Sequence, residues 1–367
     1  MVGINIINLL NKKSFAFIII VLIFYSCKKE VLHNDNSRMT DNEFITAVDI
    51  SSYPEIALTN QPFYNLDGNK QNFLSILKEN GVNTIRLRLW VDSVDNHSGF
   101  NEVRAFAETL RNRGFKIWLT LHYSNTWADP SAQQIPSLWQ YLDFDILKDS
   151  VYTYTERVVN ELKPNYIQIG NEINSGILHP HGNNSNNYDQ FLDLLQEGCS
   201  AVRNNSLDCK IILHFAGFEN ADFFFNQLKT IDYDIIGLSF YTIWHGKSME
   251  KLRTSMQNLS LSHDKQIIIA ETAYPFTLEW NDWTDNIVGL NEQLILPDYP
   301  ATPDGQRRYI RALKELTQGL EKGIGFCYWG AELVAWKGEQ ATDASTWENQ
   351  ALFDFNNKAL PVFNEFK

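Results

Sequence analysis

Eight strand-like stretches alternate with helix-like stretches from residue 46 to the C-terminal region. Most of the strand-like stretches are near-continuous apolar runs, which is typical of parallel strands buried on both faces. The expected strands are Thr46–Ser52, Thr84–Trp90, Lys116–Ser124, Tyr166–Asn174, Lys210–Gly217, Asp234–Tyr241, Gln266–Ala273 and Gly323–Glu332. The expected helices are Gln71–Asn80, Phe100–Arg113, Ile146–Leu162, Tyr188–Asn204, Ala221–Ile231, Ser248–Leu259 and Asp304–Leu320.

This alternation predicts repeated βα units, and therefore an α/β protein. Eight strands are what a (β/α)8 TIM barrel needs, and such barrels often form one domain of roughly 200–300 residues. An open doubly wound sheet is the alternative, but no glycine-rich phosphate loop follows the first strand. We therefore expect a single barrel domain whose functional residues lie at the carboxyl ends of its strands.

Reactive and aromatic residues fall late in all eight predicted strands or in the loops that follow them, with His214 late in the fifth. Such a pattern is hard to reconcile with a structural accident, because the carboxyl ends of barrel strands meet at one end of the molecule. The candidate site residues are Asp49, Arg86, Arg88, His122, Trp127, Asp129, Asn171, Glu172, Tyr241, Trp244, His245, Glu271 and Trp329.

Two glutamates, Glu172 and Glu271, lie near the ends of the fourth and seventh predicted strands. Glu172 comes at the end of Tyr166–Asn174, where strand alternation would put it on the same face as Gln168 and Gly170. Glu271 comes near the end of Gln266–Ala273. Retaining glycoside hydrolysis needs two carboxyl groups about 5–5.5 Å apart, one as nucleophile and one as acid/base. The pair therefore predicts a glycosidase.

The two glutamates are expected to differ in protonation. Glu172 is the expected acid/base, with a pKa raised by burial and by the second carboxylate. Glu271 is the expected nucleophile, and either Arg86 or Arg88 is expected to hold its negative charge. Tyr241 is expected to donate its hydroxyl to Glu271. Asn171 is placed to bond the sugar 2-hydroxyl.

Each of these residue types also has an ordinary structural role. A lone glutamate at a strand end is usually a solvated or capping carboxylate, and only the pairing argues for catalysis. His122, His214 and His245 are all compatible with packing roles, and we keep His122 and His245 as site candidates. No HxH or HExxH spacing supports zinc, so no catalytic metal is expected. The tryptophans of the site suit sugar stacking, with burial in the core as the alternative.

Composition narrows the class of partner. The chain has 367 residues, 44% of them hydrophobic, and a formal net charge of −13. This charge argues against a nucleic-acid partner, because phosphate binding needs clustered Lys and Arg. Besides Cys27, the cysteines are Cys199, Cys209 and Cys327. The sequence has no CxxC spacing, so neither a disulfide framework nor a zinc site is indicated. Cys199 and Cys209 could pair, but two buried thiols are expected.

The first residues are typical of a targeting segment. Lys12-Lys13 precede a short apolar run that ends just before Ser26-Cys27. This resembles a bacterial lipoprotein signal, although only Ser26 matches a strict lipobox. We expect a signal peptide over 1–27 that ends at a lipidated Cys27, a flexible polar tether over 28–42, and the catalytic barrel over 43–367. An ordinary signal peptide or an uncleaved anchor helix is the alternative. The expected location is the outer membrane or cell surface of a Gram-negative bacterium, through the lipid anchor.

Several motifs together resemble glycoside hydrolase family 53, the arabinogalactan endo-β-1,4-galactanases. The resemblance spans about residues 44 to 367. It is carried by Asp49-Ile50-Ser51-Ser52, Arg86-Leu87-Arg88-Leu89-Trp90, Leu121-His122-Tyr123-Ser124, Trp127-Ala128-Asp129-Pro130, Gly170-Asn171-Glu172-Ile173-Asn174-Ser175-Gly176-Ile177-Leu178, Gly237-Leu238-Ser239-Phe240-Tyr241, Trp244-His245-Gly246, Ala270-Glu271-Thr272-Ala273-Tyr274-Pro275 and Thr346-Trp347-Glu348-Asn349-Gln350-Ala351-Leu352-Phe353-Asp354.

The resemblance implies a (β/α)8 fold, retention of anomeric configuration, an acid/base at Glu172 and a nucleophile at Glu271. His179, Thr242-Ile243 and Tyr274 depart from the family's usual residues, which affects the outer subsites rather than catalysis. Some bacterial members bind structural calcium near the loops after strands seven and eight. The corresponding stretch, residues 279–286, is acidic but aromatic and matches no calcium loop that can be assigned.

These observations predict a monomeric, lipid-anchored, endo-acting galactanase that cleaves β-1,4-galactosidic bonds in pectic galactan and type I arabinogalactan. No cofactor is expected to be required for catalysis. One alternative is another β-1,4-glycanase of the same clan, such as a mannanase or a cellulase. The other is a glycan-binding lipoprotein without catalysis, against which the presence of both Glu172 and Glu271 argues.

Overall fold

The computed structural model describes residues 43–93 and 97–367. These residues belong to one compact unit, Asn42–Lys367. The predicted signal peptide with Cys27, and the tether over 28–42, lie outside the described residues. Within the described ranges, no helix is long and apolar enough to cross a membrane.

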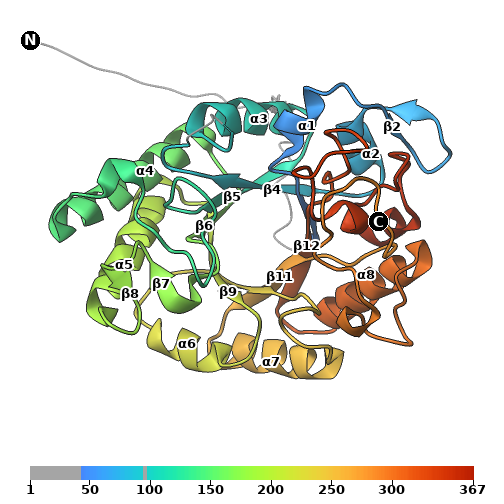
Figure 1. Cartoon of the computed structure of the whole chain (residues 1–367). Coiled ribbons are helices and arrows are strands. Elements are labelled where there is room, and N and C mark those ends of the chain that lie inside the picture. Colours follow the sequence, from blue (N-terminus) through green and yellow to red (C-terminus); the bar gives the residue numbers. More distant parts are fainter. Residues whose placement is uncertain (1–42, 94–96) are drawn as a thin grey trace, which may run out of the picture. The chain divides into compact units, whose positions relative to one another are not determined.

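Eight parallel strands close into a barrel at the centre of this unit (Figure 1). Its strands, in the order in which they pair, are β1 (Ile45–Asp49), β12 (Gly323–Trp329), β11 (Gln266–Thr272), β10 (Ile235–Ser239), β9 (Lys210–Ala216), β6 (Tyr166–Ile169), β5 (Lys116–Leu121) and β4 (Thr84–Leu89), which pairs with β1. The (β/α)8 prediction is confirmed, and each predicted strand is present. Most end a few residues earlier than predicted, because the chain turns into the functional loops there.

Helices surround the barrel, as Figure 1 shows. They are α1 (Tyr53–Ala57), α2 (Phe73–Glu79), α3 (Phe100–Asn112), α4 (Phe144–Leu162), α5 (Tyr188–Asn205), α6 (Ala221–Gln227), α7 (Met249–Ser262) and α8 (Pro303–Gln318). The seven predicted helices are all present, whereas the short α1 was not predicted. Side-chain caps begin three of them, since Asn72, Ser248 and Thr302 accept from backbone N–H groups of the first turn.

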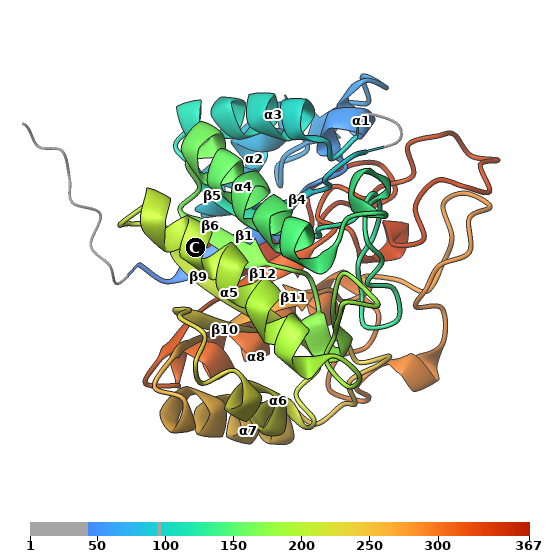
Figure 2. The same cartoon turned by 90° about the vertical axis from the view of Figure 1, so that its left-hand side faces the viewer.

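The remaining elements are short and lie in the connections. They are the hairpins β2 (Phe63–Tyr64) with β3 (Lys70–Gln71) and β7 (Gly176–Ile177) with β8 (Gly182–Asn183), and the 3-10 turns Ser137–Trp139, Ile173–Ser175, Asn291–Gln293, Glu348–Gln350 and Pro361–Phe366. Long loops follow β5, β11 and β12. Figure 2 shows parts of these loops, coloured teal, orange and red, projecting on the same side of the barrel.

The barrel lumen is a packed core rather than a channel. A cluster of buried residues fills the part of the lumen farther from the carboxyl ends of the strands, and it includes Ile45, Trp118, Ile212 and Ile268. Polar residues lie above this cluster, and the guanidinium of Arg86 lies 5.6 Å from the centre of the Trp118 ring. The apolar floor therefore supports a charged layer near the carboxyl ends of the strands. The three described cysteines are all buried and free, as expected.

Candidate active site

A cleft of about 940 Å³ opens at the carboxyl ends of the strands. All of the site residues predicted from the sequence line this one cleft. Its wall also contains residues that the sequence did not single out for binding: Ser52, Glu55, Ile287, Leu333, Trp336, Ser345 and Trp347. The fold thus brings together side chains from every part of the barrel sequence.

Glu172 enters the cleft from a turn rather than from a strand. β6 ends at Ile169, so the strand predicted over Tyr166–Asn174 is too long. The assignment of Glu172 to the strand face of Gln168 by simple alternation was therefore wrong. Gly170 has φ +77°, and a Cβ there would lie 2.4 Å from the side chain of Ile173. This turn needs a glycine at that position.

The backbone of Glu172 is itself left-handed, with φ +45°. A residue other than glycine in this region costs roughly 1–2 kcal/mol, so neighbouring contacts must hold it. Buried Gln133 provides such contacts, because its Nε2 donates to the backbone oxygens of Asn171 (2.8 Å) and Glu172 (3.3 Å). Gln133 was not among the predicted site residues, and no motif in the sequence indicated it.

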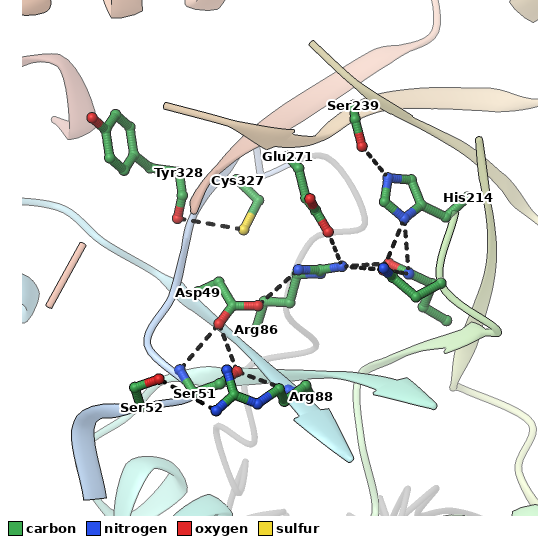
Figure 3. Close-up of polar contacts among 12 residues, drawn as sticks. Asp49, Ser51, Ser52, Arg86, Arg88, His214, Ser239, Glu271, Cys327 and Tyr328 are labelled. Carbon is green, nitrogen blue, oxygen red and sulfur yellow. Dashed lines mark hydrogen bonds and ion pairs between the residues drawn. The ribbon is translucent and has the colours of Figure 1, made fainter. Parts of the chain in front are cut away.

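Glu271 lies on β11 and is 7% exposed. Its Oε1 accepts from Nη2 of Arg86 at 2.6 Å, and its Oε2 accepts from the hydroxyl of Tyr241 at 3.0 Å. Arg86 also donates through Nη1 to Asp49 at 2.7 Å. Figure 3 shows Arg86 between these two carboxylates. The counter-ion of Glu271 is therefore Arg86, and the expected bond from Tyr241 is present.

Arg88 has a different role from Arg86, although alternation puts both on one strand face. Its Nε donates to Ser98 (2.7 Å) and its Nη2 to Ser52 (3.3 Å). Its guanidinium lies 4.2 Å from the centre of the Trp127 ring. Arg88 therefore supports an exposed aromatic side chain at the cleft rim through a cation–π contact.

The two glutamates differ in what stabilises their charged forms. Burial, followed by the nearby charge of Glu271, raises the pKa of Glu172 to about 8. Burial also raises the pKa of Glu271, but Arg86 and Tyr241 oppose this by stabilising its carboxylate. Because both strong donors face Glu271, they favour a negative charge on Glu271 over one on Glu172.

The polar residues beside the pair are held in fixed orientations. Asn171 donates through Nδ2 to the backbone oxygen of Ala128, and its Oδ1 accepts from Arg86 at 2.9 Å. Nδ1 of His122 accepts from the backbone N–H of Ala128, and burial keeps the pKa of His122 well below its usual value. His245 accepts from the backbone N–H of Tyr241, and burial lowers its pKa to about 4. Both histidines are therefore neutral at pH 7.

Aromatic rings form a connected wall along the cleft. Trp347 is at its centre, with ring centroids 4.5 Å from Trp329, 5.5 Å from Tyr241 and 6.1 Å from Trp244. Trp127 and Trp244 are 42% and 53% exposed, which leaves ring faces free for a sugar. In the sequence, Trp347 stands out only as part of a motif that resembles the family, and the loop after β12 decides its place in the cleft.

The loops after β11 and β12 carry buried oxygens that have no hydrogen-bond partner. They are Oδ2 of Asp282, Oδ1 of Asn286 and Oε2 of Glu348. Burial and the neighbouring charge of Asp282 raise the pKa of Glu348. In the described ranges, no group of three or more His, Cys, Asp or Glu is arranged to hold a metal ion. These oxygen donors nevertheless fit calcium, a hard cation that takes carboxylate and amide oxygens, and would supply part of its ligand shell.

A (β/α)8 barrel with a buried and a half-buried glutamate in one aromatic-walled cleft defines a barrel glycosidase. Comparison with known proteins gives the family. The family model described as Glycosyl hydrolase family 53 matches residues 45–366, and the chain belongs to this family.

Relatives and solved structures agree with that assignment. An arabinogalactan endo-beta-1,4-galactanase of Cellvibrio japonicus is 34% identical over 90% of this chain and 93% of the relative. A GH53 catalytic domain of Ignisphaera aggregans is 36% identical, with a TM-score of 0.83 over 89% of this chain and 96% of that one. The structure of a fungal beta-1,4-galactanase is 26% identical, with a TM-score of 0.76 over 88% of this chain and 99% of that one.

Proposed function

We propose that this glycosidase is an endo-acting, retaining hydrolase of β-1,4-galactosidic bonds in pectic galactan and type I arabinogalactan. The names of the relatives support this substrate class. The observation that carries the mechanism is the unequal setting of the two glutamates, that is, the difference in their hydrogen-bond partners and charges. Glu271 accepts hydrogen bonds from Arg86 and Tyr241, whereas the pKa of Glu172 is raised to about 8.

The unequal setting supports a double displacement. The carboxylate of Glu271 attacks C1 of the galactosyl unit, and Glu172 gives its proton to the departing glycosidic oxygen. The bond from C1 to that oxygen breaks, and a covalent α-galactosyl ester forms on Glu271. Glu172, now a carboxylate, takes a proton from water while the water oxygen attacks C1. Glu271 leaves with its negative charge restored, and the new reducing end is β-configured.

Azide rescue tests the two roles separately. With an aryl galactobioside that has an activated leaving group, Glu172→Ala should still form the ester, and azide should release a β-configured glycosyl azide. Glu271→Ala should give the α-configured azide, because azide then displaces the leaving group directly. Glu279→Ala, which changes an exposed glutamate outside the cleft, is the matched control and should behave as wild type. Exchanged configurations would show that the roles are reversed.

Product analysis tests the substrate class. Pectic galactan should yield a series of short β-1,4-linked galactooligosaccharides from internal cleavage, whereas mannan and cellulose should stay intact. Release of oligosaccharides from mannan or cellulose at a comparable rate would favour another β-1,4-glycanase. Folded wild-type protein that binds galactan without cleaving it would favour a glycan-binding protein.

We propose that the chain is exported and anchored by lipid at Cys27. The support is the sequence alone, in which Cys27 directly follows the apolar run. Each buried methylene of an acyl chain contributes about 0.8 kcal/mol to membrane binding. Cys27→Ala should therefore move the protein from the membrane fraction to a soluble one. Cys199→Ala, which changes a buried thiol, is the control. A Cys27→Ala protein that stays with the membrane would favour an uncleaved helix.

We propose that Asp282, Asn286 and Glu348 hold a structural calcium ion. It would neutralise two buried carboxylates and connect the loops after β11 and β12. The support is the set of unpartnered oxygens on these loops. Calcium should raise the unfolding temperature of the wild type and EDTA should lower it, and Glu348→Gln should weaken this response. A melting temperature insensitive to both reagents would contradict the assignment.

A further inference from the structure

A hydrogen-bonded pair, His214 and Ser239, lies against Glu172. His214 on β9 is fully buried, and its Nε2 lies 2.8 Å from Oγ of Ser239, which ends β10 (Figure 3). Oγ of Ser239 in turn lies 2.5 Å from Oε1 of Glu172. The register between β10 and β11 shifts at Ser239, which then pairs with Glu271. This irregularity puts Ser239 beside both glutamates.

The hydrogen bonds around His214 determine which ring nitrogen carries its proton. Its Nδ1 faces the backbone N–H of Glu172 at 3.3 Å and Nε2 of Gln168 at 3.0 Å. The Gln168 amide cannot be reversed, because its Oε1 accepts from Arg86 and its Nε2 donates to the backbone oxygen of Gly170. Two donors therefore meet Nδ1, so Nδ1 is the acceptor and the ring proton is on Nε2.

One acceptor also lies near Nδ1 and would favour the other tautomer. Oδ1 of Asn171 is 3.1 Å away, but it already accepts from Arg86 at 2.9 Å and from Gln168 at 3.0 Å. Burial, with the charge of Arg86, keeps the pKa of His214 well below its usual value, so the ring carries a single proton. That proton on Nε2 is donated to Ser239, whose own hydroxyl hydrogen then points to Glu172.

We propose that Ser239 and His214 are a positioning pair that occupies Oε1 of Glu172 with a directed hydrogen bond, so that the acid proton resides on Oε2. Glu172 lines the cleft, and within the described part of the chain its Oε2 has no hydrogen-bond partner. Oε2 is thus the oxygen available to the glycosidic oxygen. This inference rests on the proposed role of Glu172 as acid/base.

The same hydrogen bond stabilises the charged form of Glu172. Of the side chains that the structure describes, Ser239 is the one that donates to this carboxyl group. The other ionisable groups around it act through space or through Ser239: Glu271 from β11, Arg86 from β4, Asp129 from the loop after β5, Tyr241 after β10 and His214 from β9. Loss of the Ser239 hydroxyl should therefore raise the pKa of Glu172, because a hydrogen bond to the carboxylate is removed.

The test is a titration of Glu172 by ¹³C NMR in full-length protein with labelled glutamate side chains. The resonance is assigned by its absence in Glu172→Gln. Ser239→Ala should move the titration midpoint upward by about one pH unit. Ser239→Thr keeps a hydroxyl and should restore the wild-type midpoint. Ser260→Ala, which changes a buried serine on α7, is the control and should leave it unchanged. An unchanged or lower midpoint in Ser239→Ala overturns the proposal.

A double-mutant cycle tests whether His214 acts through Ser239. His214→Met should also raise the midpoint, because the Ser239 hydroxyl loses the donor that directs it. In Ser239→Ala the same change should add little, so the combined shift should be smaller than the sum. Strictly additive shifts would show that His214 does not act through Ser239 and would overturn the pair.

The titration uses no substrate, so its outcome is separate from the proposed function. If wild type does not cleave galactan, the proposed function fails, whatever the titration gives. If wild type is active, the alkaline limb of kcat/KM on galactan should move with the NMR midpoint in each variant. A galactan-active enzyme whose alkaline limb ignores Ser239→Ala would overturn the positioning role alone.

Discussion

Replacing Arg86 by methionine tests the electrostatic basis of the site. Arg86 is 2% exposed and bonds two buried carboxylates, Glu271 at 2.6 Å and Asp49 at 2.7 Å. In Arg86→Met, Asp49 keeps both donors from Ser51 and the nearby charge of Arg88. Glu271 keeps only the Tyr241 hydroxyl. Glu271 should therefore take up one proton in the folded variant, because an unpaired buried charge costs more than neutralisation.

The magnitude follows from the cost of that proton. With an unfolded pKa of about 4.3 for Glu, protonation at pH 7 costs about 3.7 kcal/mol, and at pH 5 only about 1 kcal/mol. The value at pH 7 falls within the roughly 3–5 kcal/mol that removal of one partner of a buried ion pair typically costs. In the variant, the folded pKa of Glu271 lies above the unfolded one, so stability present at low pH is lost as pH rises. Wherever wild-type Glu271 is ionised, the unfolding free energy of the variant should fall relative to wild type by about 1.4 kcal/mol per pH unit.

Urea denaturation of both proteins between pH 5 and 7 measures this difference. Arg86→Met combined with Glu271→Gln should lose the extra pH dependence, because the amide needs no proton. Arg308→Met, which breaks an exposed ion pair with Asp304 on α8, is the control and should change stability little over this range. Galactan hydrolysis by Arg86→Met at pH 7 should fall by roughly 10²–10³-fold, because the nucleophile is neutral and a donor is lost. A stability difference that is constant from pH 5 to 7 would refute the reasoning.

Three further outcomes are expected. In wild type, Glu172 has a folded pKa of about 8, so wild type loses stability as pH rises from 5 to 7. The unfolding free energy of Glu172→Gln should therefore rise relative to wild type by about 1.4 kcal/mol per pH unit over this range. A difference between the two proteins that stays constant with pH in urea titrations would contradict that pKa. Gln133→Leu should lower kcat more than it raises KM and cost about 1–2 kcal/mol in stability, whereas Gln196→Leu on the exposed face of α5 should do neither. Trp347→Ala should raise KM for galactan roughly tenfold, and Trp280→Ala, outside the cleft, should leave KM unchanged.

The pattern of apolar residues was sufficient to predict the barrel. Strands such as Ile235–Ser239 and Gln266–Thr272 are buried along most of their length, so they read as continuous apolar runs. Closure of eight parallel strands then forces their carboxyl ends together, and for this reason all the residues chosen at strand ends line one cleft. That inference needed no knowledge of individual contacts.

Several features of the site were beyond sequence reasoning, because they depend on register and on distant loops. Arg86 and Arg88 share a strand face, but only Arg86 pairs in register with Asp49, the last residue of β1. Trp347 reaches the cleft through the path of the loop after β12, which no periodicity describes.

The sequence by itself determined the strands, the helices and the two carboxyl groups, because burial imposes a local pattern on each element. Only the tertiary structure decided how the two carboxyl groups are positioned and which residues they contact. The left-handed turn at Gly170 and Glu172 and the register shift at Ser239 place the carboxyl group of Glu172. Contacts between residues far apart in the chain hold both features. The conformational strain of such a turn arises in the local backbone, whereas the contacts that offset this strain come from residues elsewhere in the fold.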